Sequence, residues 1–353
     1  MDIGVLSPGQ MGSGISHRLL SRGARVVTCV EGRSERTRML ARQAGVEQAP
    51  DLETLVDSVD LVISVIAPAQ AEKLARDVAG AVRSTGRRIV FAECNAIAPD
   101  TVRGIARELT DAGAGVVDGS IIGPPPTESR ATRIYVSGPS TDALERLNDF
   151  GLDVRPVGAA IGSASALKMS YAAVTKGTVA LATQLLVTAQ RNDVYEVLIE
   201  ELSDSVPQLL ALMRRRLPVM PVKAHRWVGE MEEIAQTFAD AGLPGGTFEG
   251  IADLYRWVGE HPLADETPET RDADRGMDAV IELLADPEKA ARALLGEGRD
   301  SAPEGGDPLG EGRDSAPEGG DPLGEERDSA PEGGDPLGEE RDSAPEGGDS
   351  IEG

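Results

Sequence analysis

The segment DIGVLSPGQMGSG, residues 2–14, decides the fold of this chain. Its apolar beginning predicts a short strand over residues 2–6, and the glycines that follow open a helix with Ile15 and Leu19 on its apolar face. A second apolar strand is predicted over residues 24–30. A strand, a tight turn, a helix and a second strand form the setting in which a G-x-G-x-x-G pattern indicates dinucleotide binding.

The turn itself is suited to a pyrophosphate. Gly9 and Gly12 occupy the close-approach and helix-packing positions of the pattern, whereas Ser7 replaces its first glycine. The helix N-terminus adds free N–H groups and the positive end of a dipole. An ordinary glycine-rich turn is the alternative, but the agreement of strand, spacing and following helix favours a nucleotide. The predicted cofactor contacts in this turn are Ser7, Pro8, Gly9, Gln10, Met11 and Gly12.

The end of the second predicted strand determines which dinucleotide fits. Glu31 stands where an acidic side chain holds the ribose 2′-hydroxyl of NAD. Arg33 and Ser34 follow it, and a guanidinium beside a hydroxyl suits the 2′-phosphate of NADP. The pattern favours NADP and leaves NAD as the alternative.

The rest of the first region alternates strands with helices. Buried strands are predicted over residues 60–66 and 88–92, and a helical stretch lies between them. Residues 118–126, which are rich in glycine and proline, are predicted to form a loop. We therefore expect a doubly wound parallel α/β sheet over residues 1–157. Such sheets bind ligands at the carboxyl ends of their strands, so the cofactor is expected to border Ile66, Ala67 and Asn95.

An all-helical region is predicted over residues 158–295. It begins with one long helix, residues 162–191, rich in small side chains. Lys168 is out of character in this helix, because its neighbours suit burial. A half-exposed helix with a snorkelling lysine is the plain interpretation. However, the helix begins where a cleft between the two regions is expected, and a partly buried lysine there can exchange a proton near neutral pH.

The last 58 residues, 296–353, repeat a 14-residue acidic unit, GEGRDSAPEGGDPL, and carry 19 acidic side chains against 4 arginines. They contain no aromatic residue, so they cannot bury enough apolar surface to offset the entropy of ordering. We expect a disordered, solubilising tail, with a docking site for a basic partner as the alternative.

The composition excludes several classes of function. The net charge is −25, about −10 without the repeats, which argues against sequence-independent nucleic-acid binding. Two cysteines make no disulfide framework, and neither a signal peptide nor a segment long enough to span a bilayer is evident. The three histidines are interpreted as surface residues without metal-ligand spacing. A soluble cytoplasmic protein without a metal is expected.

Together these motifs resemble the β-hydroxyacid dehydrogenase and 6-phosphogluconate dehydrogenase superfamily, in particular its branch with a DUF1932 C-terminal domain. The resemblance covers about residues 1–290. Residues 8–14 look like the family's glycine turn, and residues 32–34 are similar to its NADP-reading N-R-[ST] motif. Residues 118–123 correspond to a substrate-anion loop, which implies substrate contacts from Ser120 and Gly123. Residues 162–168 resemble G-x-G-x-x-x-K, whose lysine is the family's acid/base, here Lys168.

The resemblance implies a Rossmann domain, a helical domain that forms a homodimer, and hydride transfer. Ile122, Pro124 and Tyr171 depart from the family's polar pocket residues, which predicts a less polar pocket with Tyr171 as its second polar group. We expect an NADP-dependent oxidoreductase acting on a carbonyl or alcohol carbon of a small organic molecule. Reduction of a C=N bond is the nearest alternative, and a non-catalytic NADP(H) sensor is the alternative from another class.

Overall fold

The computed structural model describes residues 1–6 and 8–294. Its single sheet has the order β3-β2-β1-β4-β5-β6-β7-β8. The strands are β1 Asp2–Leu6, β2 Arg25–Thr28, β3 Glu47–Gln48, β4 Leu61–Ser64, β5 Val90–Glu93, β6 Gly115–Ile122, β7 Arg133–Ser137 and β8 Asp153–Gly158. Neighbouring strands are parallel except β6 and β7, which are antiparallel. The expected doubly wound sheet is confirmed, with this one antiparallel pair added.

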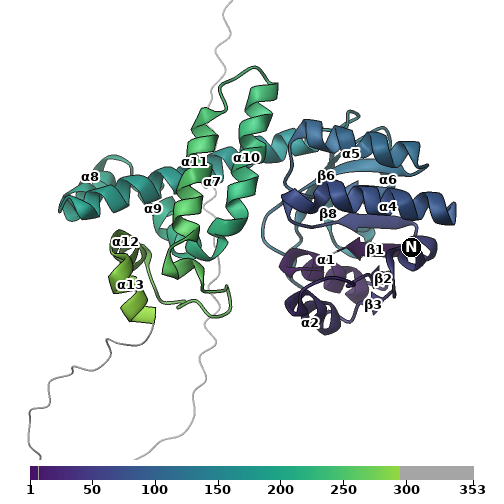
Figure 1. The fold of residues 1–353 in the computed structure, drawn as a ribbon, viewed down its shortest axis with the longest axis horizontal. Coiled ribbons are helices and arrows are strands. Elements are labelled where there is room, and N and C mark those ends of the chain that lie inside the picture. The colour runs from purple at the N-terminus through teal and green to yellow at the C-terminus, as the bar shows by residue number, and fades with distance from the viewer. Residues whose placement is uncertain (7, 295–353) are drawn as a thin grey trace, which may run out of the picture. The chain divides into compact units, whose positions relative to one another are not determined.

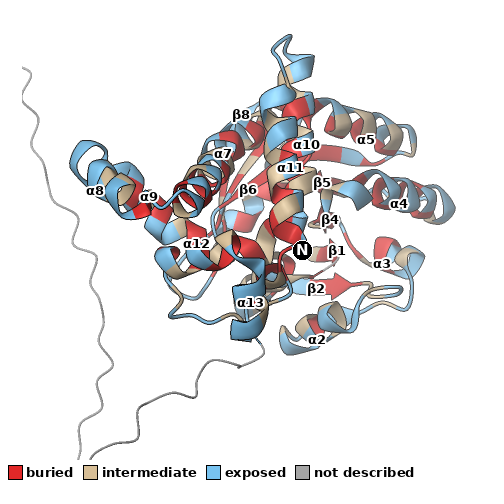
Figure 2. Ribbon diagram, turned by 60° about the vertical axis from the view of Figure 1, so that its left-hand side comes forward, coloured by how far each residue is buried: buried red, intermediate tan, exposed pale blue. Residues whose placement is uncertain are grey.

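Helices cover both faces of the sheet. The helices of this region are α1 Gln10–Ser21, α2 Glu35–Gln43, α3 Leu52–Ser58, η1 Pro68–Gln70, α4 Ala71–Thr85, α5 Pro99–Asp111, α6 Asp142–Glu145 and η2 Arg146–Phe150. Helices α3, α4 and α5 bury their apolar sides on one face, and α4 and α5 lie side by side in Figure 1. Helices α1, α6 and η2 cover the other face. The central strands are consequently buried, as their red colour in Figure 2 shows.

Residues 118–122 are strand, not loop. They form the second half of β6, where Asp118 and Ser120 are fully buried. The prediction of a loop over 118–126 was wrong for this part, because pairing with β7 outweighs the low strand propensity of Gly119 and Ser120. Gly119 has a packing reason: a Cβ there would lie 2.5 Å from Sγ of Cys94. The predicted strand over 24–30 was too long, since β2 ends at Thr28.

The second region is helical, as expected. It consists of α7 Ser163–Arg191, α8 Tyr195–Ser205, α9 Pro207–Arg216, η3 Leu217–Val219, η4 Pro221–Lys223, α10 Ala224–Asp240, α11 Gly246–Gly259, η5 Pro262–Ala264, α12 Met277–Ala285 and α13 Pro287–Leu294. Helices α10 and α11 lie side by side (Figure 1) and, with α12, pack on α7 around one apolar core. Among the described residues, α7 is long and apolar enough to cross a membrane, but half of that window is buried in this core, which is typical of a core helix.

Two carboxylates join the regions, and Asp118 is fully buried whereas Glu233 is half-buried. Asp118 of β6 accepts hydrogen bonds from the backbone N–H groups of Gly162 and Ser165, at 2.9 and 3.1 Å, and from the Ser165 hydroxyl at 2.7 Å. Glu233 of α10 accepts from the N–H of Ala98, at the start of α5, at 2.6 Å. Each carboxylate accepts hydrogen bonds from N–H groups at a helix N-terminus, which have no partner within the helix. The first region thus stabilises the start of α7, and the second region stabilises the start of α5. The described residues belong to one compact unit. The predicted disorder of residues 296–353 concerns a part of the chain outside the described residues.

Candidate active site

The nucleotide end of the site lies at the switch point of the sheet. Strands β1 and β4 are neighbours, and the chain continues from β1 to one side and from β4 to the other. Helix α1 begins here after Gly9, and its first turn contains no acidic residue. Gly12 is buried, and Gly14 packs against Pro125 and Pro126, where a Cβ would lie 3.0 Å away. Ser7 lies outside the described residues. This backbone fits a pyrophosphate at the helix N-terminus.

A pocket of about 410 Å³ lies beyond the end of β2. Arg33 lines it, and its Nη1 donates to Oε1 of Gln70 at 3.0 Å. Glu31 also lines it, and so does Lys73, which pairs with Asp77 at 2.7 Å. Ser34 does not line the pocket; its hydroxyl caps α2 by accepting from the N–H of Thr37 at 3.2 Å. The sequence pattern did not indicate Gln70 and Lys73, which reach the pocket from η1 and from the first turn of α4.

A larger cleft of about 770 Å³ lies between the sheet and the helical region. Ile66 lines both this cleft and the nucleotide pocket, so the two are adjacent. Of the residues predicted to form the site, the cleft brings together Met11, Ile66, Asn95, Gly123, Lys168 and Tyr171. Pro8, Gln10 and Ala67 do not line it. Ser120 is fully buried in β6 and does not line it either, and its Oγ has no hydrogen-bond partner among the described residues.

Asn95 connects the carboxyl ends of β4 and β5 beside the cleft through its hydrogen bonds. Its Oδ1 accepts from the N–H of Ile66, and its Nδ2 donates to the Ser64 hydroxyl at 2.9 Å. Its own N–H donates to Oε1 of Glu93 at 2.9 Å. Burial raises the pKa of Glu93 to about 8, and its Oε2 has no partner among the described residues. The carboxyl ends of β4 and β5 are thus held together where ligands of such sheets bind.

Lys168 projects into the cleft one turn after the helix start that Asp118 anchors. Burial lowers the pKa of Lys168 to about 8, and the positive charge of Arg226 acts in the same direction. Cys94, Glu93 and Asp118 oppose this shift. An ammonium with this pKa is mostly protonated at pH 7 and loses its proton readily just above, so it can act as acid or base.

The cleft is lined by both apolar and charged side chains, and Ile122 and Pro124 are among its apolar ones. Tyr171 lines it as expected, 45% exposed. The helical region also contributes a cluster of charged groups that no local motif announces: Lys176, Arg215, Arg216, Lys223, Arg226 and Glu230. They come from α7, α9, η4 and α10, and only the tertiary fold brings them together. The expectation that the pocket is less polar than the family's stays a prediction.

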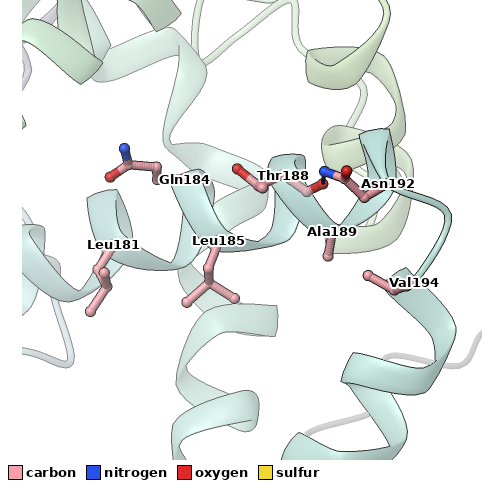
Figure 3. A pocket seen from close by; sticks show the side chains of 7 residues that line it. All are labelled: Leu181, Gln184, Leu185, Thr188, Ala189, Asn192 and Val194. Carbon is pink, nitrogen blue, oxygen red and sulfur yellow. Dashed lines mark hydrogen bonds between the residues drawn. The ribbon is translucent and has the colours of Figure 1, made fainter.

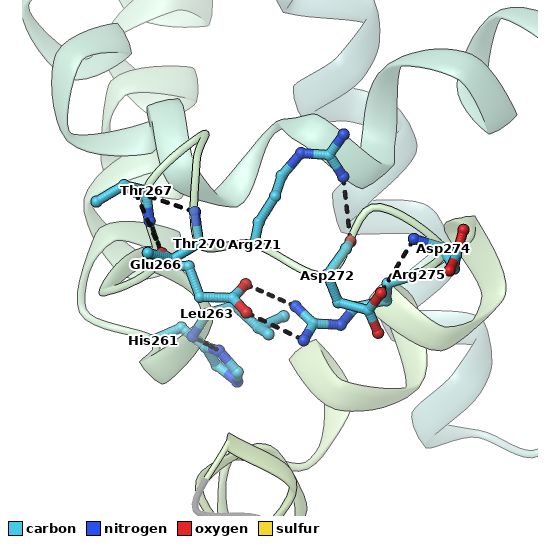
Figure 4. A network of polar contacts seen from close by, with 9 residues as sticks. All are labelled: His261, Leu263, Glu266, Thr267, Thr270, Arg271, Asp272, Asp274 and Arg275. Atoms are coloured by element: carbon cyan, nitrogen blue, oxygen red, sulfur yellow. Dashed lines mark hydrogen bonds and ion pairs between the residues drawn. The ribbon is translucent and has the colours of Figure 1, made fainter.

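A loop of the helical region approaches the nucleotide region. Glu269 pairs with Arg36 of α2 at 2.6 Å. Figure 4 shows the polar network of this loop, in which Glu266 and Arg275 form a two-pronged ion pair at 2.6 and 3.1 Å. The expectation that all histidines lie on the surface was wrong for His261, which is 5% exposed; its ring nitrogens contact the N–H of Leu263 and the carbonyl of Leu283. The described residues contain no group of three or more metal-ligating side chains.

Comparison with known proteins agrees with this geometry. Residues 2–150 match the NAD binding domain of 6-phosphogluconate dehydrogenase, and residues 189–258 match a domain of unknown function, DUF1932. The chain pairs a 6-phosphogluconate dehydrogenase-type NAD-binding domain with a DUF1932 domain. The basic cluster, apart from Lys176, comes from the DUF1932 domain.

Individual relatives span the same two domains. An uncharacterized 28.5 kDa protein of Methanothermus fervidus is 29% identical over 261 residues, 74% of this chain and 100% of that protein. A solved protein of unknown function, described as structurally similar to 3-hydroxyacid dehydrogenases, is 29% identical with a TM-score of 0.56, over 74% of this chain and 97% of the other. The 3-hydroxyisobutyrate dehydrogenase of Mycobacterium tuberculosis shares the fold, with a TM-score of 0.59 and 17% identity over 80% of this chain and 98% of the other.

Proposed function

We propose that this protein is an NADP-dependent oxidoreductase that acts on a carbonyl or alcohol carbon of a small organic substrate, with Lys168 as its general acid and base. The observation that carries the proposal is the position of Lys168: a lysine with a pKa near 8 lines the cleft that adjoins the nucleotide pocket. When bound, the dinucleotide supplies or accepts the hydride at nicotinamide C4.

Different residues of the site would bind the cofactor, orient the substrate and transfer the proton. The start of α1 and the Gly9 turn would hold the pyrophosphate, and Arg33 with Lys73 would hold the 2′-phosphate. Asn95 and Gly123 border the cleft and would orient the reacting group. Lys168 would donate a proton to the substrate oxygen in reduction and remove it in oxidation. At pH 7 Lys168 is largely protonated, so it can donate a proton to the oxygen of a carbonyl group. This supports reduction of a carbonyl over the alternative, reduction of a C=N bond.

The cofactor preference is tested by fluorescence titration of the purified protein with NADPH and NADH. We expect NADPH to bind at least about tenfold more tightly, because the guanidinium of Arg33 adds a charge-assisted contact to the 2′-phosphate. Arg33→Ala should abolish that preference. Arg38→Ala is the matched control, since Arg38 lies one turn into α2 and does not line the pocket. Equal affinities for both cofactors in the wild type would contradict the NADP assignment.

The catalytic role of Lys168 is tested by screening aldehydes, ketoacids and cyclic imines for NADPH oxidation. For the substrate found, Lys168→Ala should lower kcat by about 10²–10⁴-fold with NADPH affinity unchanged, which is the usual contribution of a general acid. A protein that binds NADPH but turns over no substrate, with or without Lys168, would favour the sensor alternative.

A further inference from the structure

The loop that follows β5 is buried, although it is neither helix nor strand. Residues 94–98 connect β5 to α5, and each of them is at most 8% exposed. A buried loop requires partners for its backbone polar groups, because water cannot reach them. The N–H of Cys94 donates to the carbonyl of Ser64 at 3.0 Å, and the N–H of Asn95 donates to Glu93 at 2.9 Å. Both acceptors belong to the NAD-binding domain itself.

The second half of this loop is held by the helical region instead. The side chain of Ala96 packs into the apolar core of that region. The N–H of Ala98 donates to Oε2 of Glu233 in α10 at 2.6 Å, and the hydroxyl of Thr101 donates to the same oxygen at 3.3 Å. Helix α10 also contacts η1, the short helix that follows β4. The helical region thus contacts the segments that follow both β4 and β5.

The same loop carries a residue that connects the two pockets of the site. Asn95 accepts a hydrogen bond from the N–H of Ile66, and Ile66 lines both the cleft and the nucleotide pocket. Asn95 itself lines the cleft together with Lys168. The chain from Asn95 to Ala98 spans at most about 11 Å, so a shift of Ala98 also moves Asn95.

We propose that Glu233 is a positioning residue of the active site: by accepting the N–H of Ala98, it fixes the loop that places Asn95 beside the nicotinamide half of the cofactor. The proposal rests on the function proposed above and adds a residue of the DUF1932 domain to it. Glu233 lines neither the cleft nor the nucleotide pocket, so it acts through the loop and not by touching the cofactor. The DUF1932 domain thereby orients a cofactor that the other domain binds.

The position of the loop determines which half of the cofactor should respond. The nicotinamide is expected beside Asn95 and Lys168, whereas the adenosine 2′-phosphate would bind in the pocket of Arg33 beyond β2. Without the carboxylate of Glu233, the buried N–H of Ala98 has lost its acceptor, which is costly and loosens the loop. Binding of the complete dinucleotide should therefore weaken, and binding of its adenosine half should not.

The test compares two ligands of the full chain, NADPH and adenosine 2′,5′-bisphosphate, by isothermal titration calorimetry. For Glu233→Ala we expect the Kd of NADPH to rise about tenfold and the Kd of the bisphosphate to stay within about twofold. A variant that is only less stable changes the binding of both ligands alike, so the ratio of the two Kd values separates positioning from destabilisation. Circular dichroism of each variant verifies that it is folded.

Two further variants serve as controls. Burial raises the pKa of Glu233, although the hydrogen bond from Ala98 opposes this shift, so a neutral acceptor should also serve there. Glu233→Gln should therefore restore most of the NADPH affinity. Glu232→Ala is the matched control, because Glu232 is the exposed neighbour on α10 and pairs with Arg256. An unchanged ratio in Glu233→Ala, an equal change in Glu232→Ala, or no recovery in Glu233→Gln would overturn the proposal.

Hydrogen exchange of the cofactor-free protein gives a readout that does not depend on the proposed function. The N–H groups of Asn95 and Ala98 should exchange at least about tenfold faster in Glu233→Ala than in the wild type, because the loop opens more often. If the wild type binds neither ligand but these amides respond, the proposed function fails and the control of the loop by Glu233 stands. If the N–H of Asn95 keeps its protection in Glu233→Ala, the positioning role is refuted.

Discussion

At the scale of single residues, the cleft depends on how burial tunes ordinary side chains. Lys168 and Glu93 both have a pKa near 8, although the free groups titrate about six units apart, because burial disfavours the charged form of each. Burial therefore raises the pKa of Glu93 and lowers the pKa of Lys168, so that both groups titrate near pH 8. Groups of this kind are typical of catalytic sites.

The titration of Lys168 can be measured without knowing the substrate. After reductive ¹³C-methylation, we expect its NMR signal to titrate with a midpoint near pH 8, well below the value of about 10.4 that is usual for a lysine. Lys168→Arg identifies the signal by removing it. The rate of carbonyl reduction should fall above the same pH, because the donor loses its proton, and the rate of oxidation should rise. A midpoint near 10.5 would contradict both the burial and the proposed role.

The sequence identified Lys168 for a sound physical reason: a charged side chain was out of place in a helix otherwise suited to burial. It could not identify Lys176, eight residues further, because a second lysine on the same helix is unremarkable until Glu230 is opposite it. It assigned Ser120 to the substrate by resemblance, and the strand buries that side chain instead. The roles proposed for Lys168, Asn95 and Tyr171 stay predictions until they are measured.

At the scale of elements, α7 is positioned by its N-terminus. The residue before it, Gly162, has a φ of 102°, which favours glycine, and the sharp turn directs the first N–H groups of the helix toward Asp118. Predicting the helix from residues 162–191 was straightforward, because its length and its caps are local. Predicting the partner of its N-terminus was not, because Asp118 lies in a strand more than forty residues earlier.

Asp118→Asn tests this anchor. We expect a loss of about 2–4 kcal/mol in the free energy of unfolding, since an amide replaces one carboxylate oxygen and leaves buried N–H donors without an acceptor. Urea denaturation measures it, with Asp111→Asn, at the exposed end of α5, as the control within about 0.5 kcal/mol. Hydrogen exchange at Gly162 and Ser165 should accelerate selectively in Asp118→Asn. Unchanged protection at these amides would show that the anchor is not needed.

At the scale of the whole molecule, α7 exposes an apolar surface that this single chain does not cover. Val174 and Leu181 are 68% and 61% exposed, and Val194 is 49% exposed. Leu181 and Val194 line a pocket of about 490 Å³, and Figure 3 shows Leu181 and Leu185 on one side of α7, with Val194 beside the start of α8. Apolar surfaces of this kind mark interaction sites. We propose that two copies of the chain pair through this face of α7, in keeping with the homodimer that the family resemblance implied.

Leu181→Glu tests the pairing by light scattering on the purified protein. The wild type should have twice the 37.0 kDa mass of one chain, and the variant should have the mass of a single chain, because a buried carboxylate without a partner is costly. Leu243→Glu is the matched control: Leu243 is 55% exposed, and it follows α10 rather than lying on α7. A monomeric wild type, or equal dissociation by both variants, would refute the dimer.

The two carboxylate joints, Asp118 and Glu233, have a consequence for protein engineering. Each carboxylate accepts hydrogen bonds from the N-terminus of a helix in the other region. These two contacts help to fix the orientation of one region relative to the other. The basic residues at 215–226 follow α7 and precede Glu233 in the chain, and none of them makes a hydrogen bond of either joint. A designer who retains both acids can therefore redesign that segment for a differently charged substrate while Lys168 and the nucleotide pocket keep their places.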